Sequence, residues 1–171
     1  TDTVKNSNIE ATAGTVDTIY GGNNIGGTTE VSNVKINGST VNTAVYGGGN
    51  QADTGETNVH LEKSQNTIPN VFGGGNQAGV TKTNVYANGM SVNNIFGGSN
   101  TNGTVNESNV TINKGTVPSV YGGNNQGGVT ETSNVTINGG TVQDVYGGGD
   151  QATTNTSNVK TLGGVIENIY G

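Results

Sequence analysis

Apolar residues alternate with polar ones over short stretches of this chain. Val135 and Ile137 alternate with Asn and Thr, the period of two that is expected for a strand burying one face. Val142 and Val145 follow, three residues apart. That spacing breaks the strand period, so we expect a corner between them that lets both side chains point inward. No stretch has helical spacing, and Gly, Thr, Asn and Val are poor helix formers, so the sequence predicts no helix.

The alternating stretch is part of a repeat. An aromatic residue followed by glycine recurs at spacings of 26, 26, 24, 25, 25 and 24 residues. A second motif, a hydroxyl residue followed by Asn and an aliphatic residue, recurs in register with it. Periods of this length indicate stacked supersecondary units that bury their apolar faces against one another. The aromatic column consists of Tyr20, Tyr46, Phe72, Phe96, Tyr121, Tyr146 and Tyr170, and the asparagine column of Asn8, Asn33, Asn58, Asn84, Asn109, Asn134 and Asn158.

The fold predicted from this repeat is an all-β, single-domain parallel β-solenoid over residues 1–171, with six to seven coils of about 25 residues. Right-handed winding is expected from the general preference of parallel crossovers. Asn37, Asn88 and Asn138 each precede a glycine between aliphatic pairs, which also suits the hairpins of an antiparallel meander. A meander gives no reason to keep so many columns, whereas a parallel coil stacks each column on itself about 4.8 Å away.

Each column then has an expected role. The aliphatic columns should form the core, the asparagine column should form an amide ladder, and a second polar column should hold a turn in the same way. The glycine after each aromatic residue marks either a site of close approach or a positive φ. The core columns are Ile9, Val34, Val59, Val85, Val110, Val135, Val159; Val16, Val41, Ile68, Val92, Val117, Val142, Ile166; and Ile19, Val45, Val71, Ile95, Val120, Val145, Ile169; the second polar column is Asn24, Asn50, Asn76, Asn100, Asn125, Asp150.

Differences in repeat length predict where the coils bulge. The extra residues are expected near Ser39-Thr40 and within 62–66, as small outward loops. Pro69 and Pro118 share one column, so that column should donate no ladder hydrogen bond.

Composition mainly excludes functions. Hydrophobic residues are 29% of the chain and 31 residues are glycine, so an ordinary globular core is not expected and stacking between coils must replace it. A net charge of −6 argues against nucleic acid and anionic membrane surfaces as partners, and the lack of a long apolar run argues against membrane insertion. Without cysteine there is no disulfide framework and no thiolate metal site.

The sequence offers little catalytic or metal-binding chemistry, and we expect no catalytic residues, no metal and no cofactor. His60, the single histidine, lies in a column of varied residues that is expected to face solvent. Asp144 and Asp150 are the nearest approach to a carboxylate pair. The glycine clusters carry neither a phosphate-loop Lys-Ser/Thr pair nor the acidic positions of calcium-binding nonapeptides.

Two columns could bind a ligand. The aromatic column (Tyr20, Tyr46, Phe72, Phe96, Tyr121, Tyr146 and Tyr170) is either an exposed stripe that stacks on sugar rings or a structural ladder that stiffens a corner. The hydroxyl column suggests the arrays of ice-binding solenoids, although the neighbouring column is not threonine; it comprises Thr15, Thr40, Thr67, Ser91, Thr116 and Thr141.

With its repeated Val-Tyr-Gly-Gly-Gly-Asn and Ser-Asn-Val-Thr-Ile-Asn-Gly phrases, the chain resembles the parallel β-helix repeat regions of bacterial surface adhesins and extracellular fibres. This resemblance implies a non-catalytic structural or adhesive protein at the bacterial surface, with a glycan or host-surface ligand. The chain is also somewhat similar to the pectate-lyase superfamily, which shares the asparagine ladder but uses Asp clusters with Arg or Lys; arginine is lacking here. Because the sequence starts and stops within repeats, we expect either a segment of a longer rod or a subunit that associates head to tail.

Overall fold

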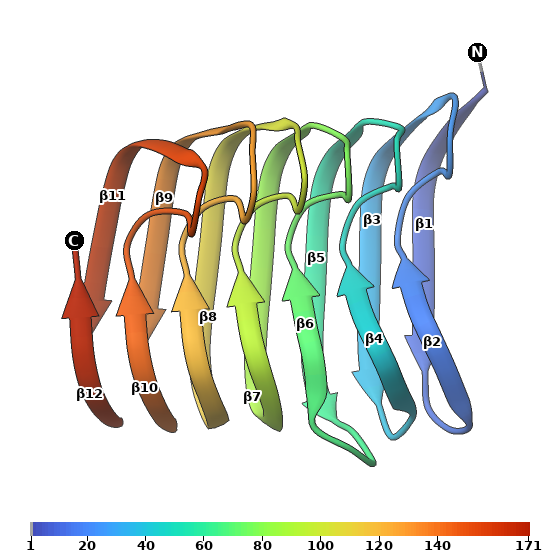
Figure 1. Ribbon diagram of the computed structural model, residues 1–171. Coiled ribbons are helices and arrows are strands. Elements are labelled where there is room, and N and C mark those ends of the chain that lie inside the picture. The colour runs from blue at the N-terminus through green and yellow to red at the C-terminus, as the bar shows by residue number, and fades with distance from the viewer. Residues whose placement is uncertain (1) are drawn as a thin grey trace.

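The structure is a computed structural model that describes residues 2–171, and all of its regular elements are strands. Seven coils stack along one axis (Figure 1). The strands are β1 Thr3–Ala11, β2 Thr15–Tyr20, β3 Thr28–Asn37, β4 Thr40–Tyr46, β5 Thr54–Lys63, β6 Ile68–Phe72, β7 Val80–Phe96, β8 Thr104–Tyr121, β9 Val129–Ile137, β10 Thr141–Tyr146, β11 Thr153–Thr161 and β12 Val165–Tyr170.

Each coil contributes two strand segments, one to each of two facing rows. β7 and β8 are long because each continues around the corner from one row to the other. All pairings are parallel, and like residues lie over like residues: Asn109 pairs with Asn134 and Tyr121 with Tyr146. The solenoid prediction is therefore confirmed, and the antiparallel alternative is wrong.

The coil is right-handed. In Figure 1 the row that contains β1, β3 and β5 runs downward behind, and the row of β2, β4 and β6 runs upward in front, while the chain advances from right to left. This is the winding expected for parallel crossovers.

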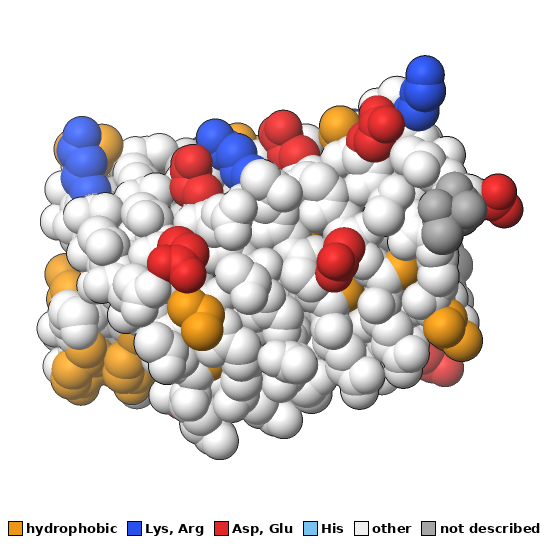
Figure 2. Space-filling model, turned by 90° about the horizontal axis from the view of Figure 1, so that it is seen from above, with side chains coloured by type: hydrophobic (Ala, Val, Ile, Leu, Met, Phe, Trp, Pro, Cys, Tyr) orange, Lys and Arg blue, Asp and Glu red, His pale blue; other side chains and the backbone are white. Residues whose placement is uncertain are grey.

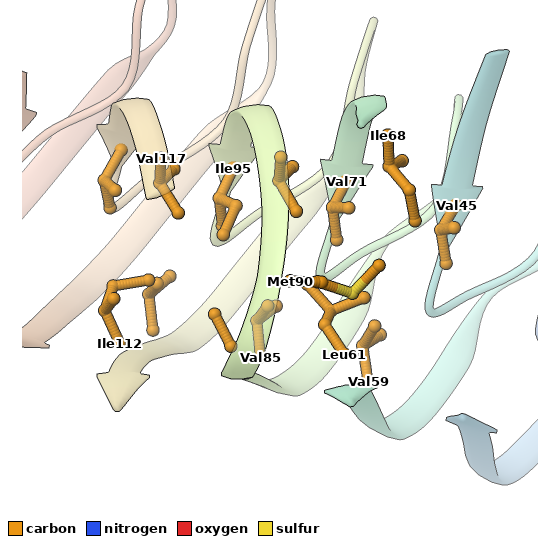
Figure 3. Close-up of a cluster of buried hydrophobic side chains, with 14 of the residues drawn as sticks. Val45, Val59, Leu61, Ile68, Val71, Val85, Met90, Ile95, Ile112 and Val117 are labelled. Atoms are coloured by element: carbon orange, nitrogen blue, oxygen red, sulfur yellow. The ribbon is translucent and has the colours of Figure 1, made fainter. Parts of the chain in front are cut away.

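The core lies between the two rows, where the predicted aliphatic columns meet (Figure 3). Its members are fully buried in the inner coils, as Val59, Val71 and Val92 illustrate. A fourth column, which was not predicted, also belongs to the core. Each of its members lies two residues after a member of the first core column; they are Ile36, Leu61, Ala87, Ile112 and Ile137. Its residue types vary, which hides the column unless the register is already known.

The third side of each coil is a glycine-rich segment that packs closely on its neighbours. A Cβ placed on Gly73 would lie 2.2 Å from the carbonyl oxygen of Gly97, and none of the glycines that follow the aromatic column has a positive φ. Close approach, rather than backbone conformation, therefore selects glycine here. Thr57 Oγ1 donates to the Gly73 carbonyl at 2.6 Å, so the two repeated phrases of the sequence bind each other across the coil.

One predicted bulge is correct and the other is misplaced. The longer connection between β5 and β6 protrudes as the 64–67 loop, as expected (Figure 1). Thr40, in contrast, pairs regularly with Thr15, and the register shifts only after Val41, so the extra residue lies at 42–43 within β4. The column of Pro69 and Pro118 makes no ladder pair in any coil, in agreement with the prediction.

Candidate functional site

The aromatic column forms one continuous stack of rings. Successive ring centroids are 4.6–5.0 Å apart, with interplanar angles between 4° and 10°. The register of the strands imposes this face-to-face geometry, because each ring is held one coil above the last. Ring faces are therefore occupied by other rings.

Burial separates the two interpretations of this column. Tyr46, Phe72 and Phe96 are only 7%, 3% and 5% exposed, and they form a hydrophobic cluster of their own with Ala44. Tyr170, in the last coil, is 47% exposed. An exposed stripe along the whole solenoid is thus wrong for the central coils, where the rings have no free face for a sugar.

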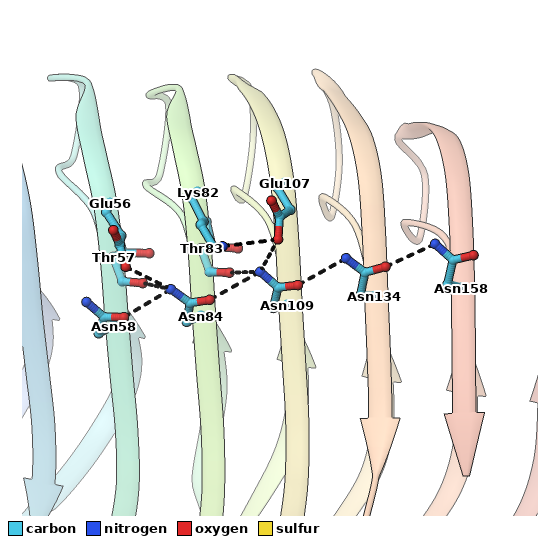
Figure 4. A network of polar contacts seen from close by, with 10 residues as sticks. All are labelled: Glu56, Thr57, Asn58, Lys82, Thr83, Asn84, Glu107, Asn109, Asn134 and Asn158. Carbon is cyan, nitrogen blue, oxygen red and sulfur yellow. Dashed lines mark hydrogen bonds and ion pairs between the residues drawn. The ribbon is translucent and has the colours of Figure 1, made fainter.

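The first asparagine ladder, formed by the predicted asparagine column, is unbroken through all seven coils. Each side-chain amide donates to the amide oxygen of the preceding coil at 2.9–3.1 Å (Figure 4). The second asparagine ladder runs from Asn24 to Asn125 with distances of 2.8–3.0 Å. A third was not predicted and links Glu62, Asn88, Asn113 and Asn138 at 2.8 Å per step.

All these ladders have the same polarity. The amide nitrogen of the later coil always donates to the oxygen of the earlier coil. An acid can therefore start a ladder, as Asp17 and Asp144 do by accepting from Asn42 and Asn168 at 2.7 and 2.8 Å. An acid cannot continue one, and the second asparagine ladder stops before Asp150, whose carboxylate has no hydrogen to donate.

Charged side chains reinforce the first asparagine ladder in the middle coils (Figure 4). Asn109 Nδ2 also donates to Glu107 Oε1 at 2.9 Å, and Lys82 Nζ lies 3.3 Å from the same oxygen. The hydrogen bond from Asn109, together with Lys82, lowers the pKa of Glu107, and this outweighs the opposing effect of burial. Elsewhere on the molecule, acids and lysines are scattered among uncharged polar residues, as the face in Figure 2 shows.

The other candidate residues are in separate places. His60 is half-buried and stacks on Tyr86, with ring centroids 4.8 Å apart. Asp144 and Asp150 both lie close enough to Tyr146 to raise its pKa, although desolvation is the larger cause. Among residues 2–171 there is no group of three or more His, Cys, Asp or Glu side chains that could hold a metal ion.

The hydroxyl column is interrupted. Thr116 pairs with Ser91 and Thr141, and Thr15 pairs with Thr40, but Thr67 lies in the loop before β6 and outside the ladder. A regular hydroxyl array therefore does not extend over all coils.

The fold and these ladders define a right-handed parallel β-solenoid repeat protein. Comparison with protein-family models, with curated proteins and with solved structures finds no match. In the part of the chain that the structure describes, no helix is long and apolar enough to cross a membrane.

Proposed function

We propose that the chain is a non-catalytic structural rod with an adhesive role, exposed on or outside a bacterial cell. It is either a segment of a large surface adhesin or a subunit that associates head to tail. The supporting observation is the unbroken first asparagine ladder, which joins every coil to the next through side chains as well as backbone. A rod built in this way resists bending and presents the same surface columns along its length.

The outer edges of the terminal strands support elongation. Within residues 2–171, β1 pairs with β3 alone and β12 with β10 alone, and an unpaired strand edge can pair with a strand of another copy. The resemblance to bacterial surface repeats supports the extracellular location.

Three measurements test this proposal. Electron microscopy of the purified chain separates the two alternatives: filaments many solenoids long support head-to-tail association, and single particles one solenoid long support a segment of a longer rod. Antibodies against the folded chain should label intact cells of the bacterium that encodes it; labelling only after lysis would rule out a surface role. Beads coated with folded chain should be retained on host-cell monolayers more than beads coated with heat-unfolded chain.

A carbohydrate-binding module is the second candidate, and the surface around His60 favours it, as argued below. Ice binding would rely on the interrupted hydroxyl column, and a thermal-hysteresis measurement tests it. An enzyme of the pectate-lyase type would have to use Asp144; turnover of a uronic-acid polymer that disappears in Asp144→Asn would support it against our proposal.

A further inference from the structure

A surface cavity of about 370 Å³ lies on the outer face of the β1, β3 and β5 row. It spans the first three coils and lies between the first asparagine ladder and the neighbouring column of Glu10, Lys35 and His60. Its size is at the lower end of the range for small-molecule sites, roughly 300–1,000 Å³, and it would accept one sugar ring.

The His60 ring forms one wall of this cavity. Tyr86 follows His60 in the same column and covers one face of the imidazole, with centroids 4.8 Å and planes 18° apart. Lys35, on the other side, has its Nζ 3.0 Å from Glu10 Oε1, so its ammonium group is directed toward Glu10 rather than toward His60. His60 therefore lines the cavity on the side of its ring that Tyr86 does not cover, and an apolar ring face can pack there.

The rim of the cavity carries an unused donor. Asn33 Nδ2 donates to Asn8 Oδ1 at 2.9 Å and makes no other hydrogen bond in residues 2–171. In the middle coils Asn84 and Asn109 direct their amide nitrogens to Glu56 and Glu107 as well. Val31 occupies the position before Asn33 that Glu107 occupies before Asn109, and its side chain accepts nothing. Asn6 occupies the position that Glu56 occupies for Asn84, and within residues 2–171 Asn33 donates no hydrogen bond to it. The second N–H of Asn33 is therefore available to a ligand.

From this arrangement we infer that the cavity binds a neutral sugar residue of a glycan. The Glu10 carboxylate accepts and the Lys35 ammonium donates, which suits hydroxyl groups that do both. These two charges cancel. Glu10 would repel an acidic ligand, and Lys35 would repel a basic one. The CH face of the pyranose packs on His60, and the spare N–H of Asn33 donates to a ring or hydroxyl oxygen. This inference rests on the proposed adhesive function and names a neutral sugar as the ligand that the chain binds.

Because His60 is the single histidine, its imidazole Cε1–H gives one assigned NMR signal from the isotopically labelled full chain. The probes are the methyl pyranosides of glucose, galactose, mannose and N-acetylglucosamine. At least one should shift this signal saturably at millimolar concentration. Glu10→Gln and Lys35→Met should each weaken binding about ten-fold, the effect of losing one hydrogen bond to a charged group.

Lys82→Met is the matched control, because it breaks the ion pair with Glu107, which is about as exposed as that of Lys35 with Glu10. It should leave the affinity unchanged. The inference fails if none of the four sugars shifts the His60 signal, if Glu10→Gln and Lys35→Met bind as well as the unsubstituted chain, or if glucuronic acid binds more tightly than the neutral sugars. Failure here leaves rod formation untouched, and electron microscopy tests that separately.

Discussion

At the scale of single residues, hydrogen-bond polarity decides where an asparagine can be replaced by aspartate. Asn24 starts the second asparagine ladder and only accepts, from Asn50 at 2.9 Å. Asn125 ends it and must donate to Asn100 at 2.8 Å. Asn24 and Asn125 thus lie in one column, but the first side chain must accept a hydrogen bond and the second must donate one.

Asn125→Asp should therefore destabilise the fold by about 1–2 kcal/mol, since it removes a donor and puts a second carboxylate next to Asp150. Asn24→Asp should cost much less, because an accepting oxygen is kept. Asp150→Asn should stabilise by roughly 0.5–1.5 kcal/mol, because it restores the missing donor. Urea denaturation at pH 7 measures all three. Equal losses for Asn24→Asp and Asn125→Asp would contradict the polarity.

Glycine positions differ in the same way. Gly73→Ala should destabilise by at least about 2 kcal/mol, because its Cβ would lie 2.2 Å from the Gly97 carbonyl oxygen and 3.0 Å from Val85 Cγ2. Gly26→Ala is the control, since nothing lies within 4 Å of its Cβ. It should leave the melting temperature unchanged or slightly higher, through the lower entropy of the unfolded chain. A Gly73→Ala protein as stable as Gly26→Ala would show that the coils are packed less tightly than described.

At the scale of elements, the aromatic column acts as a second, smaller core outside the aliphatic one. Phe96 is 5% exposed and stacks between Phe72 and Tyr121, at 5.0 and 4.8 Å. Phe96→Ala should cost about 3–5 kcal/mol in denaturant unfolding, as expected for a buried aromatic side chain. Phe96→Tyr should cost less than about 1 kcal/mol, since tyrosines occupy the same column. A small effect of Phe96→Ala would mean that the stack contributes little to stability.

The first asparagine ladder also gives stability a dependence on pH. The pKa of Glu107 is lowered in the folded state, first by Asn109 and then by Lys82. A lowered carboxyl pKa contributes stability above the ordinary value of 4.5, and this stability is lost as the pH falls through the folded-state value. Glu107→Gln should therefore show a smaller fall in melting temperature from pH 7 into the acid range than the unsubstituted chain. Glu167→Gln is the control, because this exposed carboxylate makes no ion pair within residues 2–171, and it should retain the full fall.

Repetition explains how much of these elements the sequence could predict. The aromatic, asparagine and aliphatic columns were assigned correctly, because identical residues at one spacing reveal the register directly. The fourth core column was missed because its members change between Ile, Leu and Ala. The ladder from Glu62 to Asn138 was missed although Asn88, Asn113 and Asn138 recur at one spacing, because Asn88 and Asn138 precede a glycine and were interpreted as turn residues. The cavity beside His60 was missed for another reason. The cavity depends on the orientation of the Lys35 side chain and on which amide hydrogen of Asn33 makes no hydrogen bond. The repeat pattern of the sequence specifies neither.

At the scale of the whole molecule, each coil pairs its strands with the coils before and after it, and a longer contact, from Asn100 Nδ2 to Tyr46 Oη at 3.1 Å, skips one coil. Stability should then be close to a sum of coil and interface contributions. Folding therefore requires that the register between coils is kept, whereas the number of coils sets how much stability accumulates.

Deleting residues 110–134 tests this view, because it joins Asn109 to Val135 just as Asn134 is joined to it in the native chain. Every column keeps its register and one coil is removed. The shortened chain should remain folded, with the same β-sheet circular dichroism per residue and a moderately lower denaturation midpoint. Deleting residues 110–121 removes fewer residues but about half a coil, so it would place the Asn109 strand next to the glycine-rich segment. This variant should lose cooperative unfolding, and if it proved as stable as the longer deletion, register would not be what holds the coils together.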